Sequence, residues 1–180
     1  MKVIDTPLKE VKIIIPDTYE DTRGSFFESF NEKSFQALGV HAIFVQDNQS
    51  ASSKNVLRGL HFQKAPYEQG KLVRVITGGV LDVVVDMRKD SPTFGKYFSC
   101  ELNAVNKHML WVPTGFAHGF LTLADDTIFV YKCTNFYNKA SEGGIKWNDP
   151  DLAINWGISN PLVSEKDTIL PAWKNVNEHG

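Results

Sequence analysis

Short runs rich in β-branched residues, separated by turn-forming residues, dominate this chain of 180 residues. Residues 80–87 form the clearest run, and residues 72–76 precede it across Gly78-Gly79. A glycine pair between two such runs predicts a hairpin, because glycine supplies the positive φ of tight turns. Further strands are expected at residues 11–15, 26–30, 42–45, 97–102, 108–112, 118–123 and 127–133, with a turn at Asp125-Asp126. Many short strands with frequent turns predict an all-β fold, either a sandwich or a barrel.

Helix signals are sparse, and one short helix is expected. Asn31 is a good N-cap, residues 32–38 are long enough for about two turns, and Gly39 is a good stop signal. From residue 145 onward, tryptophans and prolines interrupt the strand pattern. We therefore expect one domain over residues 1–180, in which an irregular tail of about 145–180 packs on a barrel core of about 40–135.

Composition excludes several classes of protein. The 19 basic residues against 21 acidic ones give a net charge of −2, which argues against a broad nucleic-acid or membrane surface. Two cysteines, Cys100 and Cys133, supply neither a disulfide scaffold nor a cysteine-based zinc site. The first eleven residues lack the apolar segment of a signal peptide, and no apolar stretch reaches transmembrane length. We expect a cytoplasmic protein without nucleic-acid or membrane partners.

Polar residues concentrate in residues 21–28, in residues 46–50 leading into 57–63, and in residues 70–74 and 111–120. Within residues 58–63, the strand period of two places Arg58 on one face, with Leu60 and Phe62, and His61 with Gln63 on the other. One face of a barrel strand looks inward, so either Arg58 or His61 should point into the interior, where it needs a partner. Taken singly, these residues are equally consistent with structural roles.

A metal site is a separate hypothesis. Pro113-x-Gly115-x-x-His118 resembles the second metal motif of cupin barrels, but the first motif would need His-x-His where this chain has His61-Phe62-Gln63. Two histidines and an unplaced carboxylate are enough for an iron site in principle. Because Gln63 replaces one nitrogen ligand, we expect no catalytic metal.

A series of motifs lies in order over about residues 10–173. They are Asp21-x-Arg23-Gly24-x-Phe26-x-Glu28, Gln46-x-Asn48-x-Ser50, Leu57-Arg58-Gly59-Leu60-His61-Phe62-Gln63, Lys71-Leu72-Val73-Arg74, Asp86-x-Arg88-x-x-Ser91-Pro92-Thr93-Phe94-Gly95, Pro113-x-Gly115-Phe116-Ala117-His118-Gly119-Phe120, Tyr131, Tyr137 and Ser164-x-Lys166-Asp167. Together they resemble the sugar-nucleotide epimerase family of dTDP-4-dehydrorhamnose 3,5-epimerase.

This resemblance implies a cupin-type jelly-roll barrel, or double-stranded β-helix, that works as a homodimer without a metal or organic cofactor. The implied substrate is a dTDP-linked 4-keto-6-deoxyglucose, whose C3 and C5 are both inverted. Residues 11–15 are a candidate edge strand for dimerisation.

The resemblance also implies catalytic roles. His61 would be the base, Asp167 would hold it, Lys71 would meet the C4 oxygen as it becomes an enolate, and Tyr131 would be the opposing acid. The remaining carried-over residues would bind substrate: Arg23, Arg58 and Lys166 near the diphosphate, Glu28, Gln46, Asp47 and Asn48 near the base and sugar, Tyr137 stacked on thymine, and Phe26, His118 and Glu142 at further contacts.

Three alternatives remain open from sequence. A relative that inverts one centre only, or a ketoisomerase, would use much of the same site. A metal-dependent cupin enzyme would use His61, His118 and a carboxylate. A sugar-nucleotide-binding module would bind without catalysis. A uridine-linked substrate also remains possible.

Overall fold

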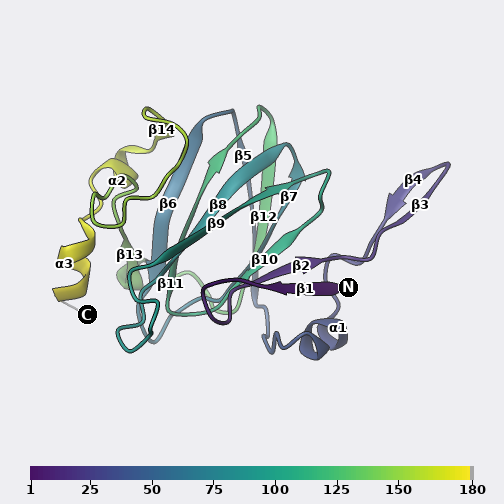
Figure 1. The fold of residues 1–180 in the computed structure, drawn as a ribbon, viewed down its shortest axis with the longest axis horizontal. Coiled ribbons are helices and arrows are strands. Elements are labelled where there is room, and N and C mark those ends of the chain that lie inside the picture. Colours follow the sequence, from purple (N-terminus) through teal and green to yellow (C-terminus); the bar gives the residue numbers. More distant parts are fainter. Residues whose placement is uncertain (179–180) are drawn as a thin grey trace.

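Two β-sheets face each other in the computed structural model, which describes residues 1–178 (Figure 1). The first contains, in spatial order, β1 (Lys2–Asp5), β2 (Lys12–Ile15), β10 (Met109–Val112), β7 (Lys71–Thr77), β12 (Thr127–Cys133) and β5 (Gln46–Ser52). The second contains β13 (Glu142–Gly144), β6 (Val56–Gln63), β11 (Phe116–Thr122), β8 (Gly79–Asp86) and β9 (Tyr97–Asn103). Both sheets are antiparallel, while β14 (Leu162–Val163) runs parallel to β6. The predicted all-β fold is therefore confirmed.

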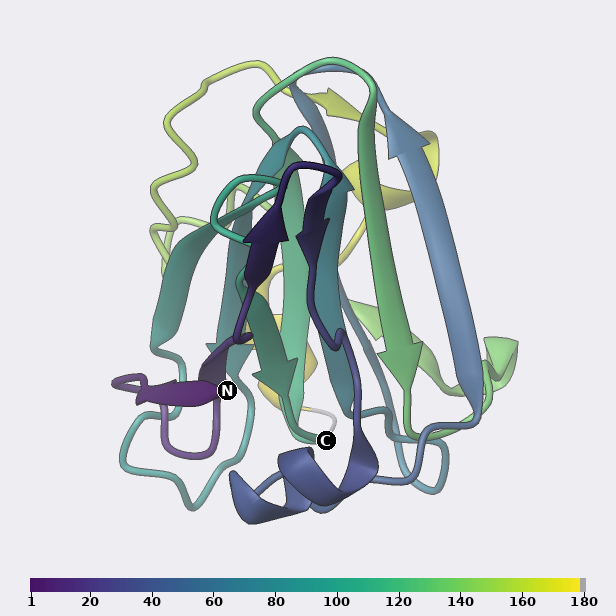
Figure 2. The same cartoon turned by 90° about the vertical axis from the view of Figure 1, so that its right-hand side faces the viewer.

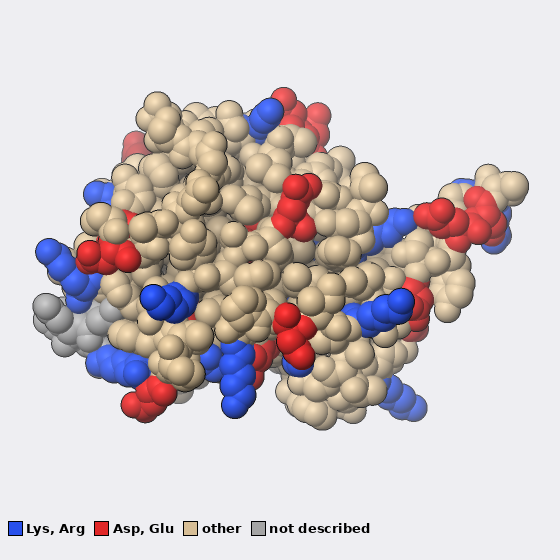
Figure 3. All heavy atoms as spheres, in the orientation of Figure 1, with Lys and Arg blue, Asp and Glu red and all other residues tan. Residues whose placement is uncertain are grey.

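The remaining elements are short. Helix α1 (Glu32–Ala37) begins after Asn31, whose side chain accepts a hydrogen bond from the Ser34 amide, as the sequence predicts. The 3₁₀ helix η1 (Lys139–Ser141), α2 (Glu165–Thr168) and α3 (Trp173–Glu178) follow the last long strand. Strands β3 (Tyr19–Asp21) and β4 (Gly24–Phe26) pair into a hairpin that projects away from both sheets (Figure 1). Acidic and basic side chains cluster on this protrusion (Figure 3).

Three apolar clusters hold these layers together. One fills the space between the sheets and includes Val73, Val84 and Phe129. A second lies where Phe35 of α1 covers the outer face of the first sheet. The third lies where Trp156 of the C-terminal segment packs on the outer face of the second sheet. Figure 2 shows α1 beneath the strands and the yellow C-terminal segment behind them. Because β11 is covered on both faces, all seven of its residues are buried.

Strand pairing differs from the sequence prediction at Gly78-Gly79. Gly78 has the expected positive φ of 76°, but β7 pairs with β10 and β12, while β8 pairs with β9 and β11. The glycines therefore join the two sheets, and the predicted hairpin is wrong. The apolar pattern located β7 and β8 correctly but carried no information on their partners.

Some predicted boundaries also change. Residues 42–45 are not a strand, and the expected strand at 26–30 is limited to β4, ending at Phe26. The expected edge strand at residues 11–15 is wrong, because β2 lies between β1 and β10. The expected strands at 97–102, 108–112, 118–123 and 127–133 are present as β9, β10, β11 and β12. Residues 179–180 of the predicted tail lie outside the described part.

Candidate active site

A cavity of about 660 Å³ opens between the two sheets, on the side where the C-terminal segment crosses β6. Strands β5, β6, β7, β11 and β12 supply its walls, and residues 162–167 supply its rim. The charged or polar side chains that line it are Asn48, Gln49, Ser50, Arg58, His61, Lys71, His118, Tyr131, Ser164, Lys166 and Asp167. All four predicted catalytic residues therefore lie at this cavity.

Arg58 and His61 both face this cavity, although a regular strand would put them on opposite faces. Their pairing with β11 explains the difference. His118 lies opposite His61 and Phe120 lies opposite Arg58, so β6 carries one extra residue between the two pairs. This bulge falls at Gly59, whose φ is 124°, and leaves Leu57 and Leu60 packed on the outer side. The predicted separation of Arg58 from His61 is therefore wrong.

His61 is held by Asp167 from the C-terminal segment. Its Nε2 donates to Oδ1 of Asp167 at 2.6 Å, and the Gly59 amide donates to Oδ2 of the same carboxylate at 3.2 Å. Ser164 caps α2 by accepting from the Asp167 amide, which fixes the position of the carboxyl group. Burial disfavours the charged form of Asp167, but the hydrogen bonds from His61 and Gly59 outweigh it and lower its pKa. His61 therefore has an ionised partner at neutral pH.

Lys71 and Tyr131 lie on adjacent strands across the cavity from the second sheet. The Lys71 Nζ is 5.9 Å from the centre of the Tyr131 ring. Burial lowers the pKa of Lys71, against the opposing effects of Cys133, Asp82 and Glu142. Burial raises the pKa of Tyr131, so its hydroxyl stays protonated at neutral pH. Tyr131 packs with Phe129 between the sheets, while the neighbouring Lys132 pairs with Asp47.

His118 forms a second histidine–carboxylate pair. Its Nε2 is 2.9 Å from each oxygen of Asp82, and the Asp82 side chain is fully buried. Burial raises the pKa of Asp82, while the charges of His118 and Lys71 work in the opposite direction. Asp82 is not among the residues predicted from the sequence, although an acidic residue in the middle of an apolar strand signals a buried carboxylate that needs a partner.

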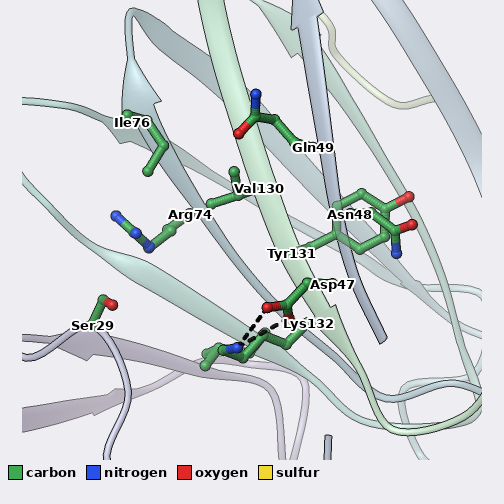
Figure 4. Close-up of a pocket in the computed structure, with 10 residues that line it drawn as sticks. Ser29, Asp47, Asn48, Gln49, Arg74, Ile76, Val130, Tyr131 and Lys132 are labelled. Atoms are coloured by element: carbon green, nitrogen blue, oxygen red, sulfur yellow. Dashed lines mark hydrogen bonds and ion pairs between the residues drawn. The ribbon is translucent and has the colours of Figure 1, made fainter. Parts of the chain in front are cut away.

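Alternate residues of β5 face opposite sides of the first sheet. Asn48 lines the main cavity, and Gln46 lines a smaller adjoining cavity of about 160 Å³. Asp47 is paired with Lys132 and borders a groove of about 470 Å³ with Arg74 (Figure 4). Asp47 therefore does not border the main cavity of its own chain.

Hydrogen bonds at the rim of the cavity join three predicted substrate-binding residues, Tyr137, Glu142 and Lys166. The Tyr137 hydroxyl donates to Oε2 of Glu142 at 2.9 Å, and the Lys166 ammonium donates to Oε1. Despite partial burial, these hydrogen bonds lower the pKa of Glu142. The Tyr137 side chain remains exposed, so its ring is accessible for stacking.

The structure does not bring Arg23, Phe26 or Glu28 to the cavity. Arg23 and Phe26 belong to the projecting hairpin, where the Arg23 side chain is 88% exposed and pairs with Asp21. Glu28 follows the hairpin and accepts from the side chain of Asn31. Within one chain, these residues are therefore separate from the site.

Gln63, which stands where a cupin metal motif would have its second histidine, forms hydrogen bonds to the backbone of two loops. Nε2 of Gln63 donates to the carbonyls of Tyr67 and Phe136, and Oε1 accepts from the Asn138 amide. Gln63 therefore ties two loops to β6. Within residues 1–178, no group of three or more His, Cys, Asp or Glu residues has a geometry suited to a metal ion. No helix in the same range is long and apolar enough to cross a membrane.

Comparison with known proteins gives a consistent result. A family model described as dTDP-4-dehydrorhamnose 3,5-epimerase matches residues 5–175. The enzyme of that name from Shigella flexneri is 55% identical over 168 residues, or 93% of each chain. The crystal structure of dTDP-4-dehydrorhamnose 3,5-epimerase from Elizabethkingia anophelis NUHP1 has a TM-score of 0.94 and 53% identity over 98% of both chains.

A third relative carries a ligand. The structure of dTDP-6-deoxy-D-glucose-3,5-epimerase RmlC from Legionella pneumophila Philadelphia 1, in complex with dTDP-4-keto-L-rhamnose, has a TM-score of 0.94. It is 45% identical and covers 99% of this chain and 95% of its own. With the family model and these relatives extending over nearly its whole length, the chain belongs to the dTDP-4-dehydrorhamnose 3,5-epimerase family.

Proposed function

We propose that this protein is an isomerase that inverts C3 and C5 of dTDP-4-dehydro-6-deoxy-D-glucose and forms dTDP-4-dehydro-L-rhamnose. Both carbons flank the C4 ketone, so a proton on either is acidic enough to be removed when the resulting enolate is stabilised. The observation that carries this proposal is one cavity with a carboxylate-held histidine on one sheet and a lysine and a tyrosine on the other.

His61 is the base in this mechanism. Asp167 occupies its Nε2, so the other ring nitrogen accepts the proton from the carbon. The electron pair of the broken C–H bond moves into the enolate, and His61 becomes an imidazolium that the ionised Asp167 stabilises. The low pKa of Asp167 supports this role, because the carboxylate is charged before the proton arrives.

Lys71 and Tyr131 act on the opposite side. Lys71 donates to the C4 oxygen as negative charge develops there. Tyr131 delivers a proton to the carbon from the face opposite His61, which inverts the centre. Its burial keeps the hydroxyl protonated until then. Proton exchange with water then restores His61 and Tyr131, and no step is assigned to a metal or organic cofactor.

Rim residues bind the nucleotide. Arg58 and Lys166 border the cavity and supply positive charge for a diphosphate, and Tyr137 offers an exposed ring for thymine. Gln46, Asn48, His118 and Glu142 provide polar groups around the same space. Asp47 borders the neighbouring groove of the first sheet and is assigned no contact in this cavity.

The proposal includes a homodimer. Tyr19 and Phe26 are each 66% exposed on the projecting hairpin, which is unfavourable for large apolar side chains unless they are covered. We place the hairpin against a second copy, so that Arg23, Phe26 and Glu28 complete the cavity of the partner subunit. The chain acts as one domain, residues 1–180, in the cytoplasm, where its two free cysteines stay reduced.

Turnover of dTDP-4-dehydro-6-deoxy-D-glucose in deuterated water tests this function. Double inversion predicts deuterium at both C3 and C5 of the product, measured by NMR. Label at C3 alone would identify a single-centre epimerase, and absence of exchange with intact dTDP binding would identify a binding module. Loss of exchange after chelator treatment, restored by metal, would contradict the cofactor-free mechanism.

A further inference from the structure

Asp82 lies behind His118, a residue of the cavity wall, and has no part in the mechanism described above. Asp82 is fully buried on β8, and both of its oxygens are 2.9 Å from Nε2 of His118. His118 is 6% exposed and lines the cavity beside His61, its register partner on the neighbouring strand. A buried carboxylate is costly unless a positive or hydrogen-bonding partner compensates it. We therefore expect this costly buried carboxylate, placed next to the cavity, to contribute to the function of the cavity.

Asp82 also interacts electrostatically with Lys71. The titratable groups that interact with Asp82 are Lys71 on β7, Cys100 on β9 and His118 on β11. Those that interact with Lys71 are Asp82, Cys133 on β12 and Glu142 on β13, and the Tyr131 ring lies 5.9 Å from its ammonium. Burial raises the pKa of Asp82, but both of its oxygens accept from His118 Nε2 and the Lys71 charge also favours the carboxylate. Asp82 thus acts as the negative charge shared by His118 and Lys71, both of which line the cavity.

We propose that Asp82 is a positioning residue for the wall of the cavity that receives the developing enolate oxygen, acting through His118 and Lys71. This inference rests on the proposed epimerase function. By accepting with both oxygens, Asp82 fixes His118 with a proton on Nε2 and leaves Nδ1 as its free nitrogen. By its charge, Asp82 keeps the Lys71 ammonium protonated at the bottom of a cavity that would otherwise favour the neutral amine.

The Asp167–His61 and Asp82–His118 pairs therefore have opposite roles. Asp167 prepares His61 to take a proton, whereas Asp82 keeps positive charge on the side where electrons accumulate. Removing the charge of Asp82 lowers the pKa of Lys71 further, because burial then acts with less opposition. The basic limb of the activity profile, where Lys71 loses its proton, must then move to lower pH.

Asp82→Asn tests this role, with Asp167→Asn as the matched change in the other pair. For Asp82→Asn we expect kcat to fall about tenfold or more, dTDP affinity to stay within about twofold, and the basic limb to shift down. For Asp167→Asn we expect kcat to fall as well, while the basic limb stays in place, because Lys71 keeps its interaction with Asp82. A uniform loss of kcat in Asp82→Asn without a shift of the basic limb would mean a merely structural role and would overturn the proposal.

Nitrogen NMR of His118 gives a readout that does not depend on turnover. In the unmutated protein we expect Nε2 to be protonated, and in Asp82→Asn we expect the two neutral tautomers to mix. An unmutated His118 with Nδ1 as the only protonated nitrogen would refute the proposed pairing, even if the variant fails to fold. If the unmutated enzyme shows no turnover, the epimerase function fails, while the NMR spectrum still decides whether Asp82 orients His118.

Discussion

His61 is the residue on which proton abstraction depends, because it combines a carboxylate partner with a place on the cavity wall. In His61→Ala we expect exchange at both carbons to fall by about 10²–10⁴-fold or more, the usual contribution of a positioned general base. Binding of dTDP should persist, because Arg58, Lys166 and Tyr137 remain. Solvent-deuterium exchange and calorimetric titration with dTDP measure the two effects.

His41→Ala is the matched control for this variant, since His41 is exposed and lies outside the cavity. Its exchange rate should equal that of the unmutated protein. Retained exchange in His61→Ala would remove His61 as the base. Loss of dTDP binding together with exchange would mean that the substitution damages the whole site and not the proton transfer alone.

At the scale of the element, the bulge in β6 determines where Arg58 and His61 point. A Cβ at Gly59 would lie 2.6 Å from the Gly119 Cα, and the φ of 124° is unfavourable for any other residue. Gly59→Ala should therefore destabilise the protein by about 2–5 kcal/mol, combining backbone strain with the clash, and should lower kcat by displacing His61. Urea unfolding and steady-state kinetics measure these losses.

Gly24→Ala separates the two causes of that destabilisation. Gly24 has a φ of 126°, close to that of Gly59, but nothing lies within 4 Å of an added Cβ. We expect it to cost about 1–2 kcal/mol from strain alone. Equal losses in the two variants would show that the contact between β6 and β11 tolerates a methyl group, contrary to the packing argument.

The end of β8 is tied to the following loop by a buried carboxylate. Asp86 accepts hydrogen bonds from Arg88, Ser91 and Thr93, which hold its pKa well below the ordinary value despite the burial that opposes ionisation. Its stabilising effect is therefore complete above the ordinary pKa of about 4 and is lost as pH falls below it. Asp86→Asn should cost about 2 kcal/mol or more at pH 7.

Urea unfolding of the unmutated protein and Asp86→Asn over a pH series checks this sign. The difference in stability should shrink below about pH 4. A difference in unfolding free energy that stays constant down to pH 3 would show that the negative charge of Asp86 does not contribute to stability.

Strand positions were predictable because apolar residues and turn signals are local. Residues 127–133 match β12 at both ends, and Asn31 starts α1 as expected. Partners were not predictable, because Gly78 and Gly79 suit a hairpin and a crossing between sheets equally well. The residue types of the site were predictable from motifs. The bulge at Gly59 and the pairing of Asp82 with His118 were not predictable, because both form only when β6, β8 and β11 lie side by side.

At the scale of the whole molecule, one chain carries its acid–base residues and part of its substrate-binding residues in different places. The cavity contains His61 and Tyr131, whereas Arg23 lies on the projecting hairpin, away from the sheets (Figure 1). If the hairpin of each subunit completes the cavity of the other, every site is made of residues from two chains. Such composite sites can be tested by combining two damaged subunits.

Mixing His61→Ala with Arg23→Ala protein, after dissociation and reassembly, tests this arrangement. One site of each mixed dimer would combine an intact His61 with Arg23 of the partner subunit, and the other would carry both defects. Since random assembly makes about half of the dimers mixed, about a quarter of all sites regain full activity, well above the average of the two separate variants. If each hairpin served its own chain, every site would keep one defect, and mixing would restore nothing. Light scattering on the unmutated protein, with a dimer expected, ensures that mixed dimers can form.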